Sequence, residues 1–119
     1  MKPDKFMEII RGIQEREIKV LDDREGKYAI NSDRLYNFRA IAEYRKKNMI
    51  AVAYDNVLKQ FTALNIMVMG LEQTGLKPKL EDLQELVQDI RNYMAIIECL
   101  WLDQYEYEWK SPVEKKDAV

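Results

Sequence analysis

The segment from residue 27 to residue 38 carries the side-chain types that recognise phosphates and nucleobases. Lys27 and Arg34 are cations suited to phosphate, Arg34 through the two-pronged geometry of its guanidinium. Tyr28 offers a ring for stacking on a base. Asp33 and Asn37 are four residues apart, so a helix places both on one face. The alternative is structural: Asp33 and Arg34 brace the start of a helix while Tyr28 packs its ring edge.

A second group of polar side chains follows in the last third of the chain. Glu85 and Asp89 are also four residues apart, a spacing that lets two carboxylates share a magnesium ion through oxygen ligands. Asn92 adds an amide three residues after Asp89. Acidic residues near a helix N-terminus are common for dipole reasons alone, so a solvated acidic face is the structural alternative.

Lys59 is a third candidate because it stands in a largely apolar stretch. Such a lysine either extends its amine to water or forms an ion pair with a buried carboxylate, and Asp89 is the partner that we expect first. The ligand-binding candidates are therefore Lys27, Tyr28, Asp33, Arg34, Asn37, Lys59, Asp89 and Asn92.

Composition narrows the chemistry that these residues can perform. The 119 residues contain no histidine, which removes imidazole acid–base catalysis and zinc sites that need imidazole. Cys99 is the only cysteine, so no internal disulfide can form, and its apolar neighbours predict a buried, inert thiol. A net charge of -2 gives no footprint for a nucleic-acid backbone. The first ten residues lack the apolar run of a signal peptide and the longest apolar run is too short to span a bilayer, so a cytoplasmic location without membrane contact is expected.

Apolar periodicity predicts an all-α, four-helix bundle-like single domain over residues 1–110, followed by a flexible polar tail over residues 111–119. The predicted helices span about 4–22, 33–47, 49–73 and 80–109. Gly26 is expected to close the first helix and Ser32 to cap the second. Asn48 is expected to cap the third helix, which the Thr74-Gly75 pair ends.

The expected core residues follow stripes spaced by three and four. Phe6, Ile13 and Leu21 belong to the inward face of the first helix, and Ile90, Met94, Ile97 and Trp101 to that of the fourth. The third helix is apolar on more than one side. We interpret this surplus as a contact in a homo-oligomer.

Taken together, the motifs resemble a family of small helical proteins of phages and prophages, the nucleotide-modification-associated and MazG-like proteins. The resemblance rests on Asp33-Arg34-Leu35-Tyr36-Asn37-Phe38 and on Asp89-Ile90-Arg91-Asn92-Tyr93, with Lys27-Tyr28-Ala29 before them. Where the family pattern has Lys-His, this chain has Lys59-Gln60, so the residue best suited to proton transfer is missing.

The resemblance implies a nucleotide-type small molecule as ligand, and three functions follow as expectations. The first is binding without catalysis or cofactor, in which a phage protein in the host cytoplasm sequesters a cyclic or linear nucleotide signal of antiviral defence. The second is a magnesium-dependent nucleoside triphosphate pyrophosphatase, with Glu85 and Asp89 as metal ligands. The third is an inhibitor that binds a host defence protein through the third helix or through Trp101, Tyr105, Tyr107 and Trp109.

Overall fold

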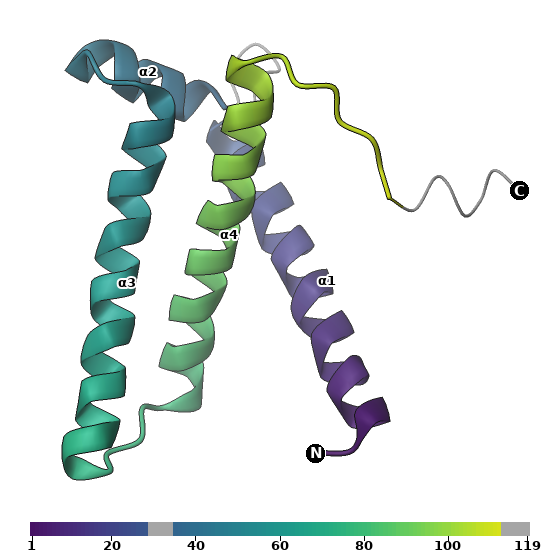
Figure 1. Ribbon diagram of the computed structural model, residues 1–119, viewed down its shortest axis with the longest axis vertical. Helices are drawn as coiled ribbons and strands as arrows, with labels where there is room; N and C mark the ends of the chain where they lie inside the picture. Colours follow the sequence, from purple (N-terminus) through teal and green to yellow (C-terminus); the bar gives the residue numbers. More distant parts are fainter. Residues whose placement is uncertain (29–34, 113–119) are drawn as a thin grey trace, which may run out of the picture.

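The computed structural model describes residues 1–28 and 35–112, and for residues 24–28 it describes the backbone alone. Four helices make up the fold: α1 (Pro3–Tyr28), α2 (Tyr36–Arg45), α3 (Met49–Thr74) and α4 (Leu80–Gln104). The described residues contain no strand, which confirms the predicted all-α, bundle-like architecture (Figure 1).

The long helices α3 and α4 run side by side in opposite directions, and α4 lies between α3 and α1 (Figure 1). The start and end of α3 are those that the sequence predicts. The side-chain oxygen of Asn48 accepts a hydrogen bond of 2.8 Å from the Ile50 N–H, which satisfies one of the free donors of the first turn. At the other end, Gly75 adopts φ 68°, a left-handed conformation that favours glycine, and its N–H donates to the Leu71 carbonyl.

The buried apolar residues form two adjacent clusters. The smaller one lies between α3 and α4 and contains Val57, Leu86 and Ile90. The larger one lies where α2 crosses the top of the α3–α4 pair (Figure 1), and it contains Phe38, Ala42, Val52, Ala53, Ile96 and Leu100. Arg39 on α2 also donates a hydrogen bond to the Asp103 carboxylate on α4. The helix α2 therefore closes one end of the α3–α4 pair.

The helix α1 is longer and less packed than the sequence predicts. It runs through Gly26 to Tyr28, so Gly26 does not close it. Leu21 packs against the larger cluster, but Phe6, expected on the inward face, is 52% exposed. Figure 1 shows α1 diverging from α4 toward its N-terminus. The radius of gyration is 17.4 Å, whereas a compact domain of this length has about 13.5 Å.

The buried side of α4 also differs from the predicted one. Met94 and Trp101 were expected in the core but are 42% and 45% exposed, while Ile96 and Leu100 are buried instead. The reason is that α4 packs against α1 and α2 as well as α3, which turns its buried side away from Met94 and Trp101. The helix ends at Gln104, five residues before the predicted limit at Trp109.

Cys99 is exposed, so the prediction of a buried thiol is wrong. No helix in the described part of the chain is both long and apolar enough to cross a membrane.

Candidate functional site

Half of the predicted ligand-binding residues fall at or beyond the end of α1. Lys27 and Tyr28 form part of its last turn, but their side chains lie outside the described part of the structure. Asp33 and Arg34, with the predicted cap Ser32, lie outside the described residues altogether. Their role in a ligand site stays a prediction.

The other predicted residues are distributed over three helices. Asn37 is half-buried in the first turn of α2, and Lys59 is exposed on α3. On α4, Asp89 is half-buried and Asn92 is buried. The expected ion pair between Lys59 and Asp89 is not among the ion pairs of the described residues, and the exposure of Lys59 fits an amine extended into water.

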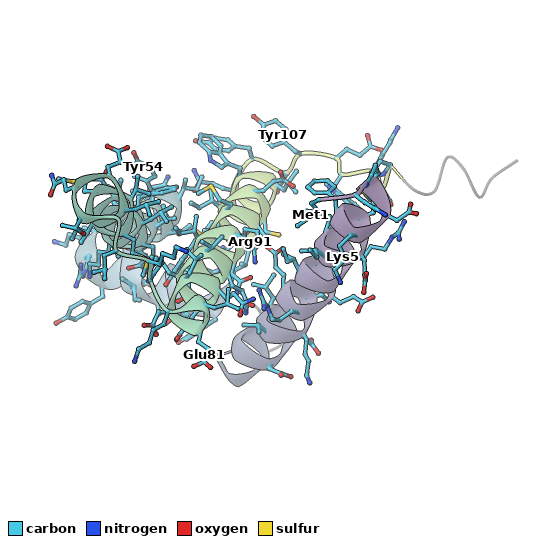
Figure 2. The ribbon with its side chains drawn as sticks, turned by 90° about the horizontal axis from the view of Figure 1, so that it is seen from below. Met1, Lys5, Tyr54, Glu81, Arg91 and Tyr107 are labelled. Carbon is cyan, nitrogen blue, oxygen red and sulfur yellow. The ribbon has the colours of Figure 1, made fainter. Side chains whose placement is uncertain are left out.

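The structure places a different set of buried and half-buried polar side chains on α4 and on α1. Gln88, Arg91 and Asn92 share one side of α4, because residues three and four apart are neighbours on a helix. Arg91 points toward α1 (Figure 2), where its Nε lies 3.7 Å from the Oε2 of Glu17. Arg16 precedes Glu17 on α1. We call these five residues, Arg16, Glu17, Gln88, Arg91 and Asn92, the polar seam.

Several buried atoms of the polar seam have no hydrogen-bond partner. They are both amide atoms of Asn92, the Nε of Arg16, and the Nε and Nη2 of Arg91. Asn92 is only 5% exposed, so bulk water has little access to its amide. A buried polar group without a partner costs about 1–3 kcal/mol, and more if it is charged. The polar seam is therefore a place where an added partner lowers the free energy of the folded state.

The unpartnered atoms define which chemical groups fit the polar seam. A guanidinium only donates hydrogen bonds and attracts anionic oxygens, with phosphate and carboxylate the best geometric matches. The Asn92 amide donates and accepts at once, which matches the edge of a nucleobase. Asp89, three residues before Asn92 on α4, borders the polar seam and adds an acceptor for hydroxyl or amino groups.

The two carboxylates predicted to hold magnesium lie on α4 without a cluster of further ligands among the described side chains. Glu85 is exposed and Asp89 half-buried, and no group of three or more metal-ligating side chains gathers within residues 1–23 and 35–112. Two carboxylates on one helix leave most of the coordination shell to water, so we derive no hydrolytic step from them.

An apolar groove lies on another side of the molecule, between the start of α3 and the end of α4. Its volume is about 380 Å³, and the residues that line it are Asn48, Ile50, Ala51, Tyr54, Ile97, Trp101 and Tyr105. The rings of Trp101 and Tyr105 stack with centroids 5.3 Å apart. We call this feature the aromatic groove. None of the ligand-binding residues predicted from the sequence lines it.

Sequence reasoning missed most of both features. Glu17 is not among the site residues predicted from the sequence, and Trp101 is predicted in the core. The signal for the polar seam was present in Glu17, which interrupts the apolar stripe of α1 at a position that faces the bundle.

Comparisons with protein-family models, curated proteins and solved structures found no match for this chain. Its fold and its site therefore define it only as an all-α protein with a polar seam between α1 and α4 and an aromatic groove between α3 and α4.

Proposed function

We propose that this chain binds a nucleotide at the polar seam without transforming it. The observation that carries the proposal is the Asn92 side chain, which is buried with both amide atoms unpartnered. In the bound state, Arg16 and Arg91 donate to the phosphate oxygens, and Asn92 pairs with an edge of the base. Asp89 accepts from a hydroxyl or amino group.

The packing of α1 supports an entry route for such a ligand. Residues 3–9 at the start of α1 are all exposed, whereas Glu17 and Leu21, further along the helix, contact the rest of the molecule. A modest displacement of α1 therefore opens the polar seam while the cores around α2, α3 and α4 stay intact. Closure of α1 over the ligand then excludes water from the charged groups, which strengthens their interaction.

The resemblance to phage proteins adds a biological setting to the proposal. A stoichiometric binder in the host cytoplasm lowers the free concentration of a nucleotide signal used in defence. Lys27, Tyr28, Asp33, Arg34 and Asn37 remain the further ligand-binding residues that the sequence predicts.

Isothermal titration calorimetry against mononucleotides, cyclic mononucleotides, cyclic dinucleotides and cyclic ADP-ribose isomers tests the proposal. We expect heat with at least one of them and a thermal shift, because a ligand at a hundredfold its Kd stabilises by about 2.7 kcal/mol. Asn92→Leu should abolish the heat, whereas Asn65→Leu, at an exposed position of α3, should keep it.

The same samples separate binding from the alternative function. Hydrogen exchange should slow in α1 when the ligand binds. Release of pyrophosphate from any nucleoside triphosphate with magnesium, lost in Asp89→Asn, favours the pyrophosphatase instead. The absence of heat and of a thermal shift with every member of the panel refutes nucleotide binding.

A further inference from the structure

The side of the α3–α4 pair that carries the aromatic groove is apolar along most of its length. On α3, Tyr54, Leu58, Phe61 and Val68 recur at spacings of four, three and seven, and each is at least 40% exposed. On α4, Met94, Trp101 and Tyr105 recur at seven and four and are also exposed. We call these seven residues the apolar face.

The two helices bring these residues into register. Tyr54 and Trp101 both line the aromatic groove, which fixes their relative level. Because α3 and α4 are antiparallel, seven residues further along α3 and seven back along α4 place Phe61 level with Met94. Tyr54 and Tyr107 lie on the same side of the pair in Figure 2, and the ring of Tyr107 is 6.1 Å from that of Tyr105. The apolar face is thus continuous across both helices.

We propose that a second copy of this chain docks on the apolar face, so that the two α3–α4 pairs form a four-helix interface. The repeat of seven residues on both helices is the pattern by which paired helices pack at small angles. The exposed fractions of the seven side chains amount to about 700 Å² in each copy, and two copies reach the range of about 1,200–2,000 Å² that specific interfaces bury.

Charge sets a condition on how the second copy docks. In a two-fold symmetric interface each residue meets its own kind near the axis, so charges there would repel. Between Leu58 and Val68 on α3 the stripe is interrupted only by the neutral Asn65, whereas on α4 the exposed Glu98 lies between Met94 and Trp101. The proposed two-fold axis therefore passes beside Phe61 on α3 and away from Glu98. The apolar face and the polar seam involve different residues, so the proposal is independent of nucleotide binding.

Sedimentation equilibrium at protein concentrations of about 1 to 100 µM tests the proposal, because this range covers common dimer dissociation constants. We expect the mass to approach twice the monomer value of 14.2 kDa. Phe61→Lys should weaken the dimer roughly 30-fold or more, since it places a charge at the centre of the interface. Ile66→Lys is the matched control, because Ile66 is 64% exposed but lies off the stripe, and this variant should dimerise normally.

Trp101 fluorescence gives a second measurement that does not depend on whether Phe61→Lys folds. In Trp109→Phe, Trp101 is the remaining tryptophan, and its emission should shift to shorter wavelength as the concentration rises and the ring loses contact with water. A wild-type protein that stays monomeric at 100 µM overturns the proposal. A folded Phe61→Lys variant that dimerises as well as the wild type also overturns it. The proposal is likewise overturned if the wild-type chain associates only with a different protein.

Discussion

The guanidinium Nε of Arg91 lies 3.7 Å from the Oε2 of Glu17 and joins α4 to α1 across the polar seam. The two side chains are 30% and 19% exposed, so solvent screens their attraction only in part. The Nη2 of Arg91 is buried without a hydrogen-bond partner. The pair therefore holds α1 in place without satisfying the guanidinium.

Glu17→Gln should have opposite effects on stability and on anion binding. Loss of the carboxylate leaves Arg91 without its counter-charge and should destabilise the protein by about 1 kcal/mol, a value reduced for partial exposure. The same change makes the polar seam more positive, so affinity for pyrophosphate or a nucleotide should rise. Urea unfolding and calorimetry measure the two effects. Glu8→Gln is the control: Glu8 pairs with Lys5 at 3.4 Å on the surface and should change stability by less than about 0.5 kcal/mol.

Asn92→Leu should stabilise the ligand-free protein by about 1 kcal/mol. The substitution removes two buried polar atoms that lack partners and replaces them with an apolar side chain of similar size. Thermal or urea unfolding without added ligand measures the effect. A loss of 1 kcal/mol or more would mean that the amide has a structural partner in solution and that the polar seam is already satisfied.

Lys46→Gly should also stabilise the protein, by about 0.5 kcal/mol. Lys46 ends α2 with φ 54°, a left-handed conformation that costs residues with a Cβ about 1 kcal/mol and glycine almost nothing. Part of the gain is offset by the greater freedom of glycine in the unfolded chain. Arg45→Gly, one residue earlier and still helical, should destabilise by up to about 1 kcal/mol. Equal changes in the two variants would contradict the conformational argument.

The Cys99 thiol should react slowly near neutral pH although it is exposed. Partial burial, followed by the charge of Glu98, raises its pKa above the ordinary value of 9.0. A raised pKa lowers the thiolate fraction at any pH below it, so the rate with a disulfide reagent should still be increasing above pH 9.0. Glu98→Gln should move this profile slightly to lower pH. A rate that levels off below pH 8, about one unit under the free thiol value, would be inconsistent with the raised pKa.

Local signals in the sequence predicted the ends of α3 well. Asn48 and Gly75 act through hydrogen bonds and backbone angles within a few residues, so their effect does not depend on distant parts of the chain. The prediction that Gly26 ends the first helix is wrong, because a glycine inside a helix costs only about 1 kcal/mol and a helix as long as α1 tolerates that cost.

The sequence did not predict which sides of the helices meet. The expected core positions Met94 and Trp101 have the correct spacing, but the order in which α1, α2 and α3 surround α4 decides which stripe is buried. The polar seam depends on the same arrangement, because Glu17 and Arg91 are 74 positions apart in the chain and no local pattern links them. The ligand candidates Asn37, Lys59 and Asp89 remain predictions for the same reason.

The short connection at residues 75–79 has a consequence for how the chain reaches its native state. Helices that follow one another and pack directly close only a small loop, which costs little entropy and lets them associate early. The α3–α4 hairpin should therefore assemble first and provide the surface onto which α2 and finally α1 condense. Slow steps in refolding should then be sensitive to substitutions in α1.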